Sequence, residues 1–243
     1  MYESAQFALA IFLLSFTTKL SRRSILGVSY LVSKSHQFGI MLYSLIYLPG
    51  TIIHELSHFF SAAILGVRTG NISIFPNKEK DRLKLGSVEI QKTDFIRSSL
   101  IGIAPFITGA TLLLYLTSIL NISNGIGVFD SLVSIFNRSI NTTIILQIYL
   151  IIAISNTLFT SKEDRRHWPV LIVISLITYF AIYISGNNIS LNHQITNSAK
   201  STLLDVVGAF YIAIFLNLII YFIITIISKI LEKILKRKIV YIK

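Results

Sequence analysis

The chain has 243 residues, of which 53% are hydrophobic and only 14% charged, and its mean hydropathy is +0.71. In a soluble domain about a quarter of the residues are charged, and a disulfide-stapled secreted domain needs cysteine, which this chain lacks. Both classes are therefore excluded. Basic loops beside an anionic membrane surface explain the net charge of +11 without nucleic acid. The composition therefore predicts a polytopic protein of the cell membrane.

Six stretches approach the roughly 20 apolar residues that cross a bilayer. In chain order they are 5–20, 37–67, 100–120, 144–160, 169–185 and 206–227. The first is short for a span, and the second is long and contains Pro49-Gly50, which either bends it or ends an upstream turn. We expect an all-α membrane fold with about six transmembrane helices.

A small β-hairpin is expected directly after the second apolar stretch. Weakly apolar alternation at 72–74 and 83–90 flanks a charged turn at 76–82. Such a hairpin could clamp an extended substrate by strand addition, or it could simply be a solvated hairpin.

The basic residues predict the orientation. If 37–67 crosses once, the hairpin, the 161–168 loop and the tail from Lys229 share one side and hold 16 of the 22 basic residues, so this side should be cytoplasmic. Four basic residues between Lys19 and Lys34 argue the opposite way, a conflict that is softened if 5–20 lies in the interface.

The second stretch also carries the chemistry. It contains His54-Glu55-Leu-Ser-His58, and residues four apart lie on one helix face, so both imidazoles can bind one ion. Glu55 is placed to take a proton from water at that ion. Ionisable groups cost about 2.5 to 3.5 kcal/mol each in a membrane helix, which favours a Zn²⁺ site over a chance pattern.

A catalytic zinc needs a third protein ligand. His36, His167 and His193 lie at segment ends or in loops, which leaves Asp164, after the fourth stretch, as the better candidate. Asp164 could equally be a solvated loop acid paired with Arg165 or Arg166.

These motifs resemble the site-2 protease family of intramembrane zinc metalloproteases. The likeness covers about 38–168 and includes HExxH in an early helix, a hairpin, an Ala104-Pro105 helix, and Asn156 eight residues before Asp164. The resemblance implies that His54, His58 and Asp164 bind zinc, that Glu55 is the base, and that Asn156 holds substrate or the oxyanion. The chain departs from the family motifs at four positions, Ala104, Thr108, Phe159 and Arg165.

We therefore expect three regions: an N-terminal hydrophobic segment and basic loop (1–35), a metalloprotease core (36–168), and two C-terminal transmembrane helices with a basic tail (169–243). The expected function is hydrolysis of peptide bonds in or next to transmembrane segments of membrane proteins, with one zinc per chain towards the cytoplasmic side. Two alternatives remain open. One is a membrane zincin that cuts exposed peptides, with Glu232 as third ligand. The other is a non-proteolytic metal-binding adaptor or transporter, for which Asp205 is the other acid near a span.

Overall fold

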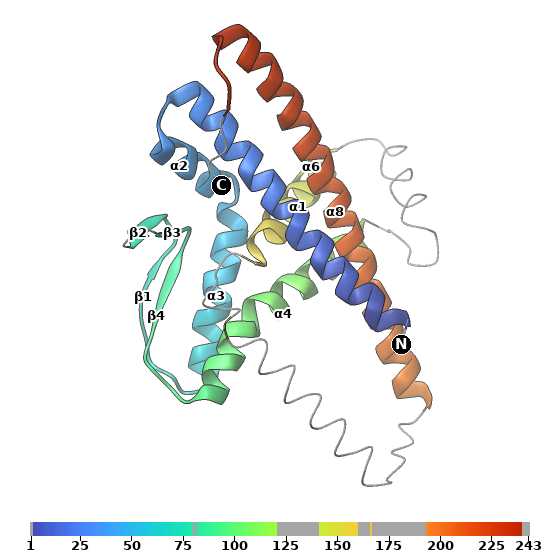
Figure 1. The fold of residues 1–243 in the computed structure, drawn as a ribbon. Coiled ribbons are helices and arrows are strands. Elements are labelled where there is room, and N and C mark those ends of the chain that lie inside the picture. Colours follow the sequence, from blue (N-terminus) through green and yellow to red (C-terminus); the bar gives the residue numbers. More distant parts are fainter. Residues whose placement is uncertain (1, 80–81, 121–140, 160–165, 167–192, 240–243) are drawn as a thin grey trace.

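The computed structural model describes residues 2–79, 82–120, 141–159, 166 and 193–239 (Figure 1). These residues are mostly helical, as the sequence predicted. The helices are α1 (Tyr2–Ser33), α2 (His36–Ile46), α3 (Leu48–Ile64), α4 (Phe95–Ile119), α6 (Thr142–Thr157) and α8 (His193–Leu235). The strands are β1 (Thr69–Ser73), β2 (Asn77–Glu79), β3 (Arg82–Lys84) and β4 (Ser87–Ile90).

Three of the described helices are long and apolar enough to cross a membrane, namely α1, α4 and the Lys200–Leu235 part of α8. The bent pair of α2 and α3 makes a fourth crossing if it counts as one span. Helix α6 has 16 residues, about 24 Å at 1.5 Å per residue, which is less than the roughly 30 Å hydrocarbon core. The described chain thus holds fewer spans than the six predicted, and 169–185 lies outside the described residues. The long apolar helices indicate a membrane protein.

Helix α1 extends beyond the predicted 5–20 segment. Residues 21–33, expected as a basic loop, continue the helix because small side chains pack along it: Ser21, Ser24 and Gly27 are buried. The basic side chain of Arg22 lies over the ring of Tyr43, 5.5 Å from its centroid. This cation–π contact allows a charged side chain to lie on the surface of α1 that packs against α2.

The second apolar stretch is broken into α2 and α3, which meet at Tyr47 with a bend of 74°. Pro49 lies in the first turn of α3, where its missing N–H is harmless, whereas a continuous helix would lose a hydrogen bond there. The carbonyl of Ile46 at the break accepts a hydrogen bond from the Tyr149 hydroxyl at 2.9 Å. The stretch therefore both ends one helix and starts another at a new angle.

The predicted hairpin is present beside α3 (Figure 1). Helix α3 ends at Ile64, and Gly66, two residues later, has a φ of 68°, the left-handed conformation that glycine adopts without strain. Strands β1 and β4 then pair antiparallel, with Ile72 opposite Val88, and β2 pairs with β3 beyond them. The hairpin thus returns the chain to α3 before α4 begins.

The core lies where α1, α4, α6 and α8 meet. Helices α1 and α8 run side by side over most of their length (Figure 1). Phe7 and Phe210 stack there with ring centroids 6.0 Å apart, and Leu14, Leu113, Ile151 and Phe210 are fully buried. This packing fixes α6 and α4 against α3.

Candidate metal centre

The HExxH motif lies on the buried part of α3. His54, Glu55 and His58 are only 6%, 7% and 7% exposed. The two imidazole centroids are 5.0 Å apart and the ring planes are 83° apart. Two imidazoles one helical turn apart on the same helix face can both reach a single ion.

His58 is oriented by helix α4. Its Nδ1 lies 2.9 Å from the carbonyl oxygen of Ile101, so Nδ1 carries the proton and Nε2 is the ring atom that can bind an ion. In a regular helix the Ile101 carbonyl would accept the N–H four residues later, but that residue is Pro105, which has no N–H. Pro105 therefore leaves a buried main-chain acceptor that His58 uses.

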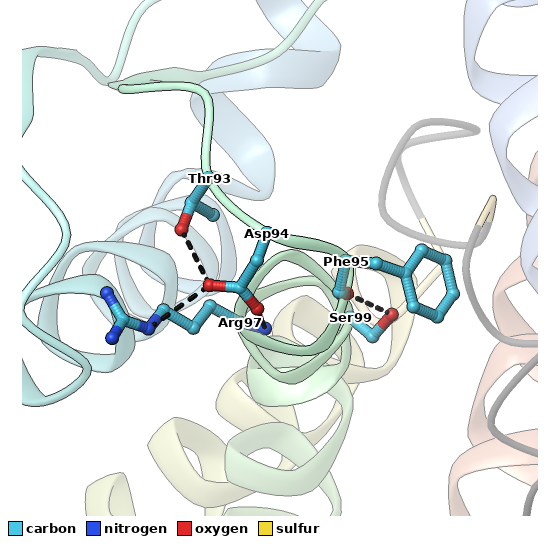
Figure 2. Close-up of polar contacts among 5 residues, drawn as sticks. All are labelled: Thr93, Asp94, Phe95, Arg97 and Ser99. Carbon is cyan, nitrogen blue, oxygen red and sulfur yellow. Dashed lines mark hydrogen bonds and ion pairs between the residues drawn. The ribbon is translucent and has the colours of Figure 1, made fainter.

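The start of α4 is fixed by its N-cap, Asp94 (Figure 2). Its carboxylate accepts the backbone N–H of Arg97 at 3.0 Å and the hydroxyl of Thr93 at 3.3 Å, and it pairs with the Arg97 side chain at 3.2 Å. The backbone N–H of Arg97, followed by the Thr93 hydroxyl and the Arg97 charge, lowers the pKa of Asp94 below its ordinary value. This cap sets where α4 begins, less than two turns before Ile101.

Glu55 lies against the hairpin. A Cβ added at Gly86, which precedes β4, would be 2.8 Å from Cγ and Oε1 of Glu55 and 2.9 Å from a methyl of Thr51. Only a residue without a side chain allows the hairpin backbone to approach the carboxylate this closely. The hairpin therefore covers the face of α3 that carries Glu55.

Helix α6 approaches the same end of α3 through Gly50. A Cβ at Gly50 would overlap the carbonyl oxygen of Ala153 and lie 2.6 Å from Oγ1 of Thr157. Gly50 and His54 are four residues apart and share a helix face. The last turn of α6 therefore packs against α3 one helical turn before the imidazole of His54.

Asn156 belongs to this last turn of α6 and is 5% exposed. Its Nδ2 donates to the Ile152 carbonyl at 2.9 Å and to Oδ1 of Asn217 at 2.6 Å. Its Oδ1 is buried and has no hydrogen-bond partner among the described residues. A carboxamide with both N–H groups engaged can offer only this acceptor.

Asp164, the predicted third ligand, lies outside the described residues, as do Glu163 and His167. Within the described ranges, no group of three or more His, Cys, Asp or Glu is gathered as an ion would require. Glu232, near the end of α8, accepts the backbone N–H of Ile239 at 2.7 Å through its carboxylate and so holds the segment that follows the helix. The described part of the chain thus supplies two imidazoles and a neighbouring carboxylate.

Three features around the motif were not found from the sequence. The Ile101 carbonyl is a main-chain group, so residue identity does not reveal it, although Pro105 in an apolar helix marks an unpaired carbonyl four residues earlier. Gly86 lies inside the 83–90 stretch that was expected as a strand, where a glycine can mark a close backbone approach but does not reveal its partner. Asn217 could have been noticed as the polar residue inside the apolar 206–227 run, since polar residues in membrane helices usually bind across helices.

Comparison of the chain with known proteins gives no match to a family model, to a curated protein or to a solved structure.

Proposed function

We propose that the chain is a membrane-embedded zinc metallopeptidase that hydrolyses peptide bonds in or next to transmembrane segments. The observation that carries the proposal is the His54–His58 pair, buried in α3 with Nδ1 of His58 engaged by the Ile101 carbonyl. Zinc ligands of this type almost always donate their second ring N–H to a carbonyl or carboxylate. Two imidazoles, one already held in this way, fit Zn²⁺.

When bound, the ion would acidify a water molecule and polarise the substrate carbonyl. The proton transfers are assigned to a side chain of the protein. Glu55 takes a proton from the attacking water and returns it to the leaving amine, and its burial beside Gly86 keeps bulk water from that carboxylate. A structural metal site has no use for such a base, so Glu55 favours the enzyme over an adaptor.

Asp164 is the proposed third ligand. It follows the end of α6 at Thr157 by seven residues, and α6 packs on α3 at Gly50. A loop leaving that helix end starts beside the face of α3 that carries His54. Support for Asp164 therefore comes from the place where α6 ends.

The site is proposed to open towards the cytoplasm, on the side that holds most of the basic residues. The chain has no cysteine, so a single-cysteine variant gives an unambiguous signal. We expect Lys92→Cys, at an exposed position just after β4, to react with a membrane-impermeant maleimide in inverted vesicles but not in intact cells. The reverse pattern would contradict this orientation.

The function is tested first by the metal content of the purified protein in detergent. We expect about one zinc per chain, lost in His54→Ala, lowered in Asp164→Ala and retained in Glu55→Gln. His36→Ala, which changes a histidine at the start of α2, is the matched control and should keep its zinc. Cleavage of a panel of single-span peptides of about 25 residues in liposomes is then measured.

Each result has one meaning. Zinc-dependent cleavage that disappears in Glu55→Gln supports the peptidase. Zinc that Asp164→Ala leaves unchanged moves the third ligand to another residue. Folded protein that holds no zinc and cleaves no peptide of the panel contradicts the proposed function.

A further inference from the structure

The polar residues behind Asn156 form a chain across three helices. Asn217 of α8 is fully buried, and its Nδ2 donates to the Ala213 carbonyl at 2.8 Å and to the Ser155 hydroxyl at 3.0 Å. The backbone carbonyl of Asn217 accepts the Ser21 hydroxyl of α1 at 3.2 Å. In this way α1 and α8 together hold one side-chain amide against α6.

This chain of bonds fixes the orientation of both amides. The Ala213 carbonyl can only accept a hydrogen bond, so the NH₂ group of Asn217 must face it, and the side-chain oxygen of Asn217 then faces Asn156. That oxygen and the Ile152 carbonyl are both acceptors, so they claim both N–H groups of Asn156. The Asn156 oxygen is consequently the atom that faces away from the network.

A buried acceptor without a donor costs about 1–3 kcal/mol, so a folded protein retains one where something else supplies the donor. An oxyanion cannot be that partner, because it is itself an acceptor. A peptide N–H can be, and it is a group that an unwound transmembrane segment brings unpaired into the membrane.

We propose that Asn217 is a positioning residue that holds the Asn156 carboxamide with its oxygen towards the substrate, where it accepts a backbone N–H of the unwound peptide. The inference rests on the proposed function and selects between the two roles that the family resemblance leaves for Asn156. Asn156 touches the substrate, and Asn217 acts through it. Helix α8, outside the region that carries the motif likeness, thereby becomes part of substrate binding.

The test measures binding rather than turnover. The probe is the fastest-cut peptide of the panel, labelled with a fluorophore and bound to the Glu55→Gln variant, which retains zinc and does not cut. A series of analogues replaces each non-scissile amide near the cut by an ester, which removes one N–H. We expect one analogue to bind about tenfold more weakly than the all-amide peptide, the size of one buried hydrogen bond.

In the Glu55→Gln background, Asn217→Ala should reduce the ratio of the two dissociation constants, ester analogue over all-amide peptide, to about one, because the Asn156 amide is then no longer held in place. Asn217→Asp should restore it, because its carboxyl group keeps an oxygen at the position that accepts the N–H of Asn156. Ser21→Ala removes a bond at the same junction but leaves both amides in place, so the ratio should remain about tenfold. If the role of Asn217 were merely structural, Asn217→Ala would change the affinities for the all-amide peptide and the ester analogue by the same factor.

A tenfold ratio that persists in Asn217→Ala, or a parent variant that no ester analogue affects, overturns the inference. If Asn217→Ala does not fold, Asn156→Ala is measured in its place and should abolish the ratio. The two proposals fail differently. Wild-type protein that holds zinc and cleaves the peptide, with the ratio unchanged, refutes only this inference, whereas protein without zinc or cleavage refutes the function itself.

Discussion

Replacing Pro105 by alanine separates the stability of α4 from the organisation of the metal site. Alanine restores an N–H that can bond the Ile101 carbonyl within the helix, and so competes with Nδ1 of His58, now 2.9 Å from that oxygen. His58 would lose its fixed tautomer and ring orientation. Helix α4 would gain one backbone hydrogen bond.

The two effects have opposite signs. Loss of the partner that orients a zinc-binding histidine typically weakens metal affinity about 10–100-fold, or about 1.4–2.7 kcal/mol. A neutral buried hydrogen bond contributes about 0.5–1.5 kcal/mol, so we expect the lower end, close to tenfold. The metal-free protein should be at least as stable as wild type, because proline costs up to about 3 kcal/mol in a helix interior relative to alanine.

The assay is a competition titration of zinc against a chromophoric chelator in detergent, paired with thermal unfolding of the chelator-treated protein. Pro49→Ala is the matched control, because Pro49 lies in the first turn of α3, where no helical hydrogen bond is missing. Its zinc affinity should remain within about twofold of wild type. An unchanged zinc affinity in Pro105→Ala, or an affinity that falls only together with the stability of the metal-free protein, would refute the role assigned to the Ile101 carbonyl.

Three further predictions concern close approaches and the α4 cap. Gly86→Ala should slow peptide cleavage about 10–100-fold with zinc retained, because the new methyl displaces Glu55 by a large fraction of an ångström. The matched control is Gly70→Ala on β1 of the same hairpin, where the new methyl meets the exposed Glu89 and not the motif, so the rate should stay unchanged. Gly50→Ala should destabilise the protein by about 1–3 kcal/mol in chemical unfolding, since backbone of α6 occupies the added volume, and wild-type stability would contradict the close contact. Because the pKa of Asp94 is lowered in the folded protein, its contribution to stability is complete above the ordinary pKa of 3.8 and is lost as pH falls through the lower folded-state pKa. In thermal unfolding, acid should therefore destabilise Asp94→Asn less than it destabilises wild type. Equal losses of stability in the two proteins would argue against the cap.

Residue pattern alone predicted the parts of the site that depend on local geometry. The spacing of His54 and His58 determines their shared face in any helix, and alternation around a charged turn is enough to indicate the hairpin. In the structure both imidazoles and Glu55 are buried on α3.

The remaining features depend on tertiary packing. Helix α1 continues past its basic residues because α8 and α2 cover its small side chains, and nothing within 21–33 indicates those neighbours. The Ile101 carbonyl becomes an acceptor for His58 only after α4 packs on α3. Asn217 is 61 positions from Asn156, and no spacing rule connects residues so far apart.

The pairing of α1 with α8 has a consequence for biosynthesis. Phe7 meets Phe210 only after about 200 further residues have been translated, which takes roughly 10–40 s at 5–20 residues per second. During that interval the side of α1 that packs on α8 lacks its partner. The buried threonines of α1 suit this state, since Thr17 and Thr18 donate to the carbonyls of Leu14 and Ser15 in their own helix. The bundle is therefore complete only after α8 has been synthesised, when the last of the described helices packs against the first.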